Sequence, residues 1–127
     1  MFFSLIIPVY NRPDEVSELL QSLSESDYNE DFEVVIVEDG SSLPCEKVVD
    51  NFRDKLDISY YFKANSGPGD SRNFGMAKAK GDYFLIFDSD CIIPKQYLNE
   101  VATALERRYV DCFGGPDQAL DSFSDIQ

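Results

Sequence analysis

Residues 32–42, FEVVIVEDGSS, decide the expected fold. The six residues from Phe32 to Val37 are almost uninterrupted by polar side chains, and such a run is typical of a strand buried on both faces of a parallel sheet. The run then changes to acidic, glycine and serine residues, which favour turns. The sequence therefore predicts an interior strand that ends at a polar loop.

Strand and helix patterns alternate on both sides of this stretch. Further strands are predicted at residues 3–9, 58–62, 83–87 and 109–113. Apolar residues at i, i+3, i+4 and i+7 predict helices over residues 16–23 and 98–105. Weaker helical patterns cover residues 46–54 and 69–80, with Gly81 as the C′ residue of the second. Parallel strands need crossover connections, so we expect an α/β protein with three layers, α/β/α, around a mostly parallel sheet.

The composition excludes several classes of partner. The 127 residues suit one domain, and 11 Lys and Arg residues against 24 Asp and Glu residues give a formal net charge of -13. Nucleic-acid binding depends on neutralising phosphates with basic side chains, so we expect no nucleic-acid partner. An anionic membrane surface is disfavoured for the same reason. An acidic protein still binds an anionic ligand when a divalent cation bridges the two.

Histidine is absent and three cysteines are present. The absence of histidine excludes histidine-based triads, zinc sites and general bases. An odd number of cysteines without a CxxC spacing favours a reduced, cytoplasmic setting over a disulfide framework. The apolar start, MFFSLII, lacks a basic region and breaks at Pro8, so we predict no signal peptide or membrane segment in this chain.

Polar side chains gather where three of the predicted strands end. Tyr10 and Asn11 follow the first strand, Asp39 follows the second, and Asp88 and Asp90 follow the fourth. In open parallel sheets, ligands bind beyond the carboxyl ends of the strands. Asn, Asp, Gly and Ser are ordinary turn formers, but three such ends at one edge favour a binding site there.

The pair Asp88 and Asp90 suggests a divalent cation. In an extended segment, residues i and i+2 point to the same side, with side chains roughly 6–7 Å apart. Two carboxylates about 5 Å apart repel each other by about 3 kcal/mol at an effective dielectric constant near 20. Mg²⁺ or Mn²⁺ reverses the sign of this interaction, and commonly uses one or two carboxylates plus substrate phosphates. A D-x-D pattern by itself also occurs by chance in acidic proteins.

Two further side chains each have two possible roles. The carboxylate of Asp39 could accept the imide N–H of a uracil or thymine, or it could form an Asx-type turn with Ser41 and cap the next helix. Arg72 is the only basic residue between Lys63 and Lys78. Its guanidinium could neutralise a phosphate or pin a loop carboxylate, or it could pair with Asp70 or another aspartate at the surface.

Four motifs, contained in three stretches of the sequence, resemble one known family in the same order. SLIIPVYNR (residues 4–12), VVIVEDGSS (34–42) and NSGPGDSRNFGMAKAKGDYFLIFDSDC (65–91) resemble the N-terminal half of family 2 glycosyltransferases, which have the GT-A fold. The resemblance covers residues 3 to about 95 and is far more specific than D-x-D alone. It implies a Rossmann-like nucleotide-diphospho-sugar transferase that acts, with inversion, on an acceptor hydroxyl.

The resemblance also implies roles for individual residues. The partners would be a nucleotide-sugar donor, a UDP-sugar, and a glycan or lipid-linked acceptor, with Mn²⁺ or Mg²⁺ as cofactor. The positions that match the family's motifs are Pro8, Tyr10 and Asn11 in the nucleoside pocket, Asp39 at the base, Arg72 and Asn73 near the nucleotide, Asp88 near the ribose or sugar, and Asp90 at the metal.

One departure from the family pattern limits the prediction. Inverting members use a general base, usually an aspartate, well downstream of the D-x-D, and Asp117 comes too early for it. We therefore predict that residues 1–115 are the donor-binding half of a truncated GT-A domain and that residues 116–127 are a loosely ordered tail. No catalytic base is assigned, and the longer parent could be attached to a membrane.

Other α/β classes fit less well. A signalling receiver domain needs an acid pair after its first strand, an aspartate after the third and a lysine after the fifth, and PVYNR, YYFKAN and FGGPD lack them. A dinucleotide-binding domain needs G-x-G-x-x-G, which is missing. A metal-dependent nucleotidyltransferase usually has a basic, Gly-rich loop after the first strand, unlike PVYNRPDE. That class and a non-catalytic nucleotide-binding module are the remaining alternatives.

Overall fold

The structure, a computed structural model, describes residues 1–107. The predicted fifth strand at 109–113, the predicted boundary after residue 115 and Asp117 lie outside the described residues. The elements in chain order are β1 (Phe3–Val9), α1 (Pro13–Ser24), β2 (Phe32–Asp39), α2 (Glu46–Asp50), β3 (Asp57–Lys63), α3 (Pro68–Lys78), β4 (Tyr83–Ile86) and α4 (Tyr97–Arg107).

The strands form one parallel sheet in the order β3-β2-β1-β4. β1 lies between β2 and β4, with Val9 paired to Glu38 and Ile6 paired to Ile86. The two interior strands, β1 and β2, are buried along almost their whole length. This confirms the expectation for the apolar run at 32–37, because an interior strand of a parallel sheet is covered on both faces.

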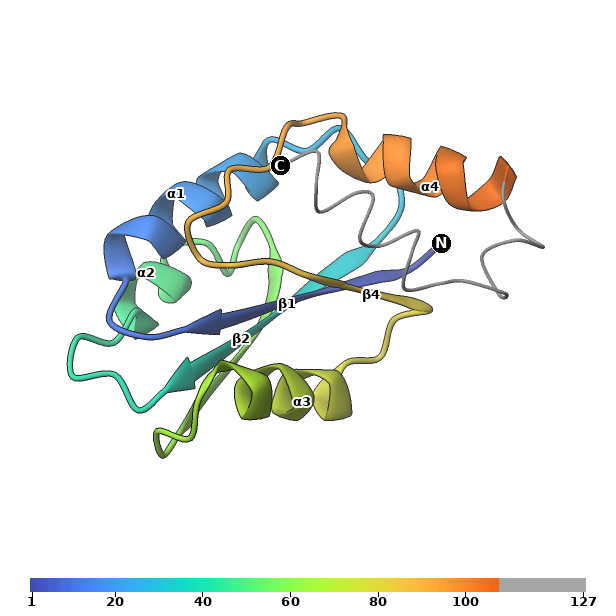
Figure 1. Ribbon diagram of the computed structural model, residues 1–127. Coiled ribbons are helices and arrows are strands. Elements are labelled where there is room, and N and C mark those ends of the chain that lie inside the picture. The colour runs from blue at the N-terminus through green and yellow to red at the C-terminus, as the bar shows by residue number, and fades with distance from the viewer. Residues whose placement is uncertain (108–127) are drawn as a thin grey trace.

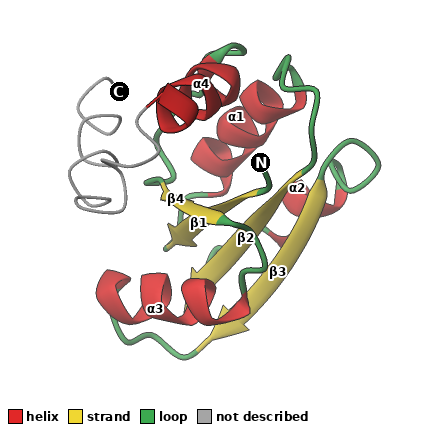
Figure 2. Ribbon diagram, turned by 90° about the vertical axis from the view of Figure 1, so that its right-hand side faces the viewer, coloured by secondary structure: helices red, strands yellow, loops and turns green. Residues whose placement is uncertain are grey.

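Helices cover both faces of the sheet, which confirms the three-layer architecture. Figures 1 and 2 show α1, α2 and α4 on one face and α3 on the other. Successive strand residues point to opposite faces, so Leu5 and Ile7 of β1 join the main core under α1 and α4, whereas Ile6 joins a smaller core with Val35 and Val37. Phe74 of α3 and its neighbours pack against that smaller core.

Helix α3 lies very close to the sheet, and Gly75 makes this possible. A Cβ atom at position 75 would lie 2.6 Å from Cγ2 of Ile6 and 3.3 Å from Cγ2 of Val37. A larger residue there would push the helix away from β1 and β2. The short connection from Lys63 at the end of β3 to Pro68 places the N-terminus of α3 beside the carboxyl ends of these strands.

Two helix boundaries differ from the predicted ones. The helix predicted over 46–54 ends at Asp50, and residues 51–55 form turns, because Phe52 N donates to Val49 O and Lys55 N donates to Phe52 O. These turns bring Phe52 into the core. Helix α3 ends at Lys78, so Gly81 is not its C′ residue. Gly81 instead touches β1, where a Cβ would lie 2.5 Å from Oγ of Ser4.

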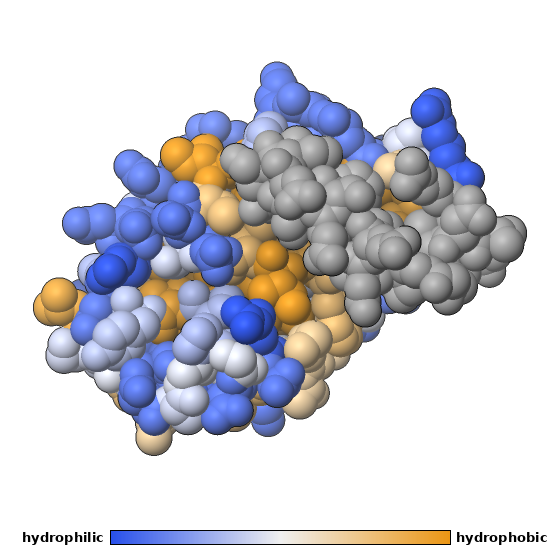
Figure 3. Space-filling model, in the orientation of Figure 1, coloured by the Kyte–Doolittle hydropathy of each residue, from blue (hydrophilic) through white to orange (hydrophobic). Residues whose placement is uncertain are grey.

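The visible part of the face drawn in Figure 3 is mainly hydrophilic. Figure 3 shows apolar side chains reaching the surface in the middle of this view, over β4 and the segment that follows it. Ile86 and Ile92 of that region are exposed. Among residues 1–107, no helix is long and apolar enough to cross a membrane.

Candidate functional site

The carboxyl ends of β1, β2 and β4 meet at one rim of the sheet. Val9 of β1 pairs with Glu38 of β2, and on the other side Phe87 N donates to Ile6 O (3.0 Å). Neighbouring strands lie about 4.8 Å apart, so the ends of β2 and β4 are separated by about 10 Å across β1. The two acidic segments at 38–39 and 88–90 therefore flank the end of β1 from opposite sides.

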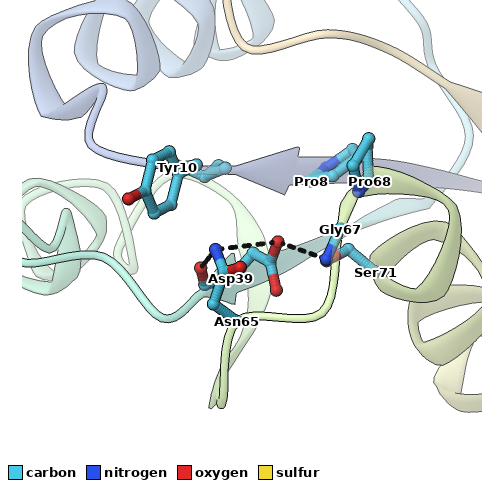
Figure 4. Close-up of a pocket in the computed structure, with 8 residues that line it drawn as sticks. Pro8, Tyr10, Asp39, Asn65, Gly67, Pro68 and Ser71 are labelled. Carbon is cyan, nitrogen blue, oxygen red and sulfur yellow. Dashed lines mark hydrogen bonds between the residues drawn. The ribbon is translucent and has the colours of Figure 1, made fainter.

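A cavity of about 330 Å³ opens at this rim, between the ends of β1 and β2 and the start of α3. Figure 4 shows the residues that line it, which are Pro8, Val9, Tyr10, Asp39, Asn65, Gly67, Pro68 and Ser71. The ring of Tyr10 is 52% exposed. The cavity thus combines an aromatic face and two proline rings with a few polar groups, as small-molecule sites commonly do.

The two-residue period of the strands explains why these side chains meet. Pro8 has the same parity as Ile6 in β1, and Asp39 has the same parity as Val37 in β2. Ile6 and Val37 both face α3, and side chains two residues apart share a face. The predicted residues Pro8 and Asp39 are therefore brought together on the α3 side of the sheet.

Asp39 is the anchor of the loop between β3 and α3. Its Oδ1 accepts hydrogen bonds from Lys63 Nζ (2.6 Å) and Ser66 N (2.9 Å), and its Oδ2 accepts one from Gly67 N (3.0 Å). Lys63 Nζ also donates to Ala64 O (3.1 Å) and to Ser66 Oγ. None of these donors belongs to α2, so the alternative in which Asp39 caps the next helix is wrong. The carboxylate binds a loop that lies far away in the sequence instead.

These contacts keep Asp39 ionised. Burial of the carboxyl group acts to raise its pKa, but the hydrogen bond from Lys63, the backbone N–H groups of Ser66 and Gly67 and the charge of Lys63 outweigh burial and lower the pKa. At neutral pH the group is therefore a hydrogen-bond acceptor only. Lys63 had no predicted role, because nothing in the sequence around it indicates which carboxylate it meets.

Gly40 allows the loop to approach the end of β2. Its φ is +69°, and a Cβ at this position would lie 2.6 Å from Asn65 N. Asn65 Nδ2 donates to the backbone oxygen of Asp39 (2.9 Å). A side chain at position 40 would therefore both strain the backbone and displace the loop that lines the cavity.

Glu38, which also had no predicted role, is fully buried on the opposite side of the strand. It shares its parity with Val34 and Ile36, so the period of two places it on the α1 and α2 side. Its Oε1 accepts hydrogen bonds from Cys45 N (2.8 Å) and Tyr60 Oη (2.7 Å), and its Oε2 accepts one from Ser41 Oγ (2.5 Å). Burial and the bond to Glu38 raise the pKa of Tyr60.

Asn11 connects the end of β1 to the loop after β2. It has a φ of +53°. Its backbone N–H donates to Ser41 Oγ (2.8 Å), and its Oδ1 accepts a hydrogen bond from Leu43 N (2.9 Å) and one from Ser42 Oγ (3.3 Å). Asn11 lies outside the set of described residues that line the cavity. Its contact with a nucleoside stays a prediction, whereas its role in shaping the rim follows from these bonds.

The segment Asp88-Ser89-Asp90 forms a turn, not an extended strand end. Cys91 N donates to Asp88 O (3.2 Å), and Ser89 Oγ donates to Glu15 Oε1 (2.9 Å) of α1. The extended geometry used to predict their spacing is therefore wrong. Both carboxylates are exposed, and neither forms a hydrogen bond or ion pair with residues 1–107.

The donor set at this turn fits a hard divalent cation that a ligand completes. Within residues 1–107, no group of three or more His, Cys, Asp or Glu side chains is arranged to hold a metal ion. The carboxylates of Asp88 and Asp90 supply oxygen ligands, which Mg²⁺ prefers, and Mg²⁺ commonly combines one or two carboxylates with substrate phosphates. Metal binding by Asp88 and Asp90 stays a prediction.

Arg72 and Asn73 lie in the first two turns of α3, outside the described lining of the cavity. Asn73 is exposed and Arg72 is half-buried. Arg72 forms no ion pair with Asp70 or with any other described residue. The alternative prediction, a surface ion pair between Arg72 and an aspartate, is therefore not observed among the described residues. Its positive charge is available for an anionic ligand, and its contact with a nucleotide stays a prediction.

Comparison with known proteins identifies the family to which these features belong. The family model described as "Glycosyl transferase family 2" matches residues 4–125. The chain belongs to glycosyltransferase family 2. The poly(ribitol-phosphate) beta-N-acetylglucosaminyltransferase TarS of Staphylococcus aureus is 37% identical over 114 residues, which are 87% of this chain and 20% of TarS. The abequosyltransferase RfbV of Salmonella typhimurium is 34% identical over 110 residues, which are 84% of this chain and 33% of RfbV.

Solved structures of other glycosyltransferases share this fold. Residues 1–349 of S. aureus TarS in complex with UDP-GlcNAc match with a TM-score of 0.81 and 37% identity over 86% of this chain and 32% of that one. The mannosyltransferase PcManGT from Pyrobaculum calidifontis in complex with GDP-Man and Mn²⁺ matches with a TM-score of 0.75 and 25% identity, over 81% of this chain and 32% of that one. The fold is GT-A, and the chain spans about a fifth to a third of the length of these relatives.

Proposed function

We propose that this protein binds a UDP-sugar and is the donor-binding part of an enzyme that transfers the sugar to an acceptor hydroxyl. One observation carries the proposal. In a chain of glycosyltransferase family 2, the cavity at the sheet rim places the exposed ring of Tyr10 beside Asp39, a buried acceptor that stays ionised. A flat heterocycle with a ring N–H complements this pair of groups.

The base binds at the cavity in this proposal. The ring of Tyr10 offers a face on which a base can stack, and such stacking contributes about 1–3 kcal/mol per base. Asp39 accepts the imide N–H of uracil. The TarS structure, which contains UDP-GlcNAc, supports a uridine nucleotide, because it is one of the more similar solved proteins.

The diphosphate extends from the cavity toward β4. Asp88 and Asp90 lie beyond the end of β4, on the other side of β1 from Asp39. Together with the phosphates they hold Mn²⁺ or Mg²⁺, and the bound cation offsets the negative charge that develops on the departing nucleoside diphosphate. The Mn²⁺ in the PcManGT complex with GDP-Man supports this cofactor. The unpaired guanidinium of Arg72 adds positive charge on the α3 side.

Transfer breaks the bond between the anomeric carbon and the diphosphate oxygen and forms a bond between the anomeric carbon and the acceptor oxygen. The acceptor loses its hydroxyl proton to a base. We assign this general base to no residue among 1–107. In this proposal Asp39 already binds the uracil, and Asp88 and Asp90 already bind the cation. The name of TarS, a transferase that acts on poly(ribitol-phosphate), supports a glycan or lipid-linked acceptor.

A thermal-shift experiment tests the donor site. UDP with Mn²⁺ should raise the melting temperature, because a ligand present at 100 times its Kd stabilises the folded state by about 2.7 kcal/mol, or about 10 °C for a domain of this size. Asp90→Ala should remove the part of the shift that depends on Mn²⁺ and retain the part that persists in EDTA. Asp54→Ala is the control, since Asp54 is exposed and precedes β3, at the opposite end of the parallel strands from the rim.

Two outcomes would contradict the proposal. The donor site is refuted if UDP, with or without Mn²⁺, leaves the melting temperature unchanged. An Asp90→Ala protein with an undiminished Mn²⁺-dependent shift would exclude Asp90 as a metal ligand. Binding of UDP-sugars without transfer to any acceptor by the longest natural form of the protein would instead support a non-catalytic nucleotide-binding module.

A further inference from the structure

Ser71 carries an unexplained hydroxyl group at the candidate site. The residue is fully buried. Its Oγ is the one buried side-chain nitrogen or oxygen atom among residues 1–107 that has no hydrogen-bond partner. Buried polar groups in native proteins are almost always hydrogen-bonded, and each exception calls for an explanation such as a ligand or an ordered water.

Other buried serines of this chain form hydrogen bonds within the protein through their hydroxyl groups. Ser4 Oγ donates to Glu33, and Ser41 Oγ donates to Glu38. Ser22, which lies in a helix like Ser71, donates to Leu19 O (2.7 Å) and accepts a hydrogen bond from Ile93 N (3.0 Å). Helical serines commonly bond a carbonyl of the preceding turn, but Ser71 does not, so its hydroxyl has no role in holding the described fold.

The position of Ser71 connects the hydroxyl to the cavity. Ser71 lies in the first turn of α3, a helix of 11 residues, and it lines the same cavity as Asp39 and Tyr10. Figure 4 shows Asp39, Gly67 and Ser71 along one side of the cavity, whereas Tyr10 and Pro8 lie on the opposite side. A ligand in this cavity is therefore the group best placed to pair with the hydroxyl.

We infer that Ser71 is a specificity-determining residue, whose hydroxyl donates a hydrogen bond to a carbonyl oxygen of the nucleotide base while Asp39 accepts the adjacent ring N–H. This inference rests on the proposed function, because it concerns the same cavity. The acceptor Asp39 complements a ring N–H of the base, and the donor Ser71 complements the carbonyl group beside that N–H. Uracil, thymine and guanine all carry a ring N–H beside a carbonyl group. Cytosine presents an unprotonated nitrogen at the corresponding position, so it faces the acceptor Asp39 with another acceptor.

The test compares Ser71→Ala with Ser22→Ala, since both remove a buried helical hydroxyl but only Ser22 has partners in the protein. The Kd of UDP and of CDP is measured by calorimetry with Mn²⁺, and the melting temperature is measured without ligand. Ser71→Ala should bind UDP about tenfold more weakly, bind CDP unchanged, and melt no lower than wild type. Ser22→Ala should melt lower and bind UDP with unchanged affinity.

Each other outcome overturns the inference in a recognisable way. If wild type binds UDP and Ser71→Ala keeps both the UDP affinity and the preference for UDP over CDP, the base contact is wrong but the donor site stands. If Ser71→Ala melts clearly below wild type without ligand, its hydroxyl has a partner in the free protein. If wild type binds neither UDP nor CDP, the inference and the proposed function both fail.

Discussion

Replacement of Lys63 by methionine should lower the free energy of unfolding by about 2 kcal/mol at pH 7. Lys63 Nζ lies 2.6 Å from Oδ1 of Asp39, and the two side chains are only 14% and 6% exposed. Methionine keeps most of the aliphatic length of lysine but removes the charge and the donors. The substitution therefore leaves the carboxylate of Asp39 buried without its cation.

The magnitude follows from the remaining partners of Asp39. An exposed ion pair contributes at most about 1 kcal/mol, whereas removal of one partner of a fully buried pair costs about 3–5 kcal/mol. In the Lys63→Met protein, Asp39 still accepts hydrogen bonds from the backbone N–H groups of Ser66 and Gly67. The expected loss is therefore close to that of one hydrogen bond to a charged group, about 1.5–3 kcal/mol.

The pH dependence has a definite sign. The pKa of Asp39 lies below its ordinary value of 3.8 in the folded protein, so its contribution to stability is present above pH 3.8 and is lost as the pH falls through the folded-state pKa. Without Lys63, burial opposes ionisation and the pKa rises. The stability difference between wild type and variant should thus be full at pH 7 and should shrink below about pH 4.

Urea unfolding, followed by tyrosine fluorescence or circular dichroism, measures the effect. With an m-value of about 1.5 kcal/mol/M, the midpoint should fall by about 1.3 M at pH 7. Asp50→Asn is the control, because it breaks the exposed ion pair with Arg53 and should change stability by less than about 0.5 kcal/mol. A loss below about 0.5 kcal/mol for Lys63→Met, or an equal loss at pH 3.5 and pH 7, would refute the role of Lys63 as the counter-charge of Asp39.

Two further substitutions test the packing around the rim. Glu38→Ala should lower the free energy of unfolding by about 3–4 kcal/mol, because two buried donors and the half-buried hydroxyl of Tyr60 lose their acceptor. In a spectrophotometric titration the pKa of Tyr60 should also fall, and an unchanged pKa of Tyr60 would contradict the network. Gly75→Ala should cost about 1–3 kcal/mol in thermal unfolding, since the new Cβ meets Ile6 at 2.6 Å. Gly69→Ala, where the new Cβ meets no described atom within 4 Å apart from its chain neighbours and the nearby backbone of its own helix, should be neutral or slightly stabilising; equal losses for both glycines would show that the contact with Ile6 is not the cause.

The strands could be predicted because their signals are local. The apolar run at 32–37 and the bounds of β1 match the structure. A strand that is buried on both faces needs consecutive apolar residues, and such a run is visible in the sequence itself. The end of α2 could not be predicted in the same way. There the turns after Asp50 bring Phe52 into the core, and the benefit of that burial depends on residues of distant elements.

The candidate site was predictable in part. Strand-end chemistry led to Tyr10 and Asp39, the family resemblance added Pro8, and the structure brings all three to one cavity. The same two-residue period that buries the strands would have indicated that Glu38 faces the opposite side of β2 from Asp39. No local signal points to Lys63, because it reaches Asp39 from another strand.

The sequence by itself determined the alternation of strands and helices, the rim at which polar strand ends gather, and the family, because all three depend on periodicity and on short motifs. Only the tertiary structure decided that Tyr60 donates to Glu38, that Lys63 neutralises Asp39, and that the hydroxyl of Ser71 is buried without a partner. These facts depend on strand order and on crossovers that place residues more than 20 positions apart in contact. Hydrogen bonding and burial act over a few ångströms in space, so no pattern of neighbouring residues specifies them.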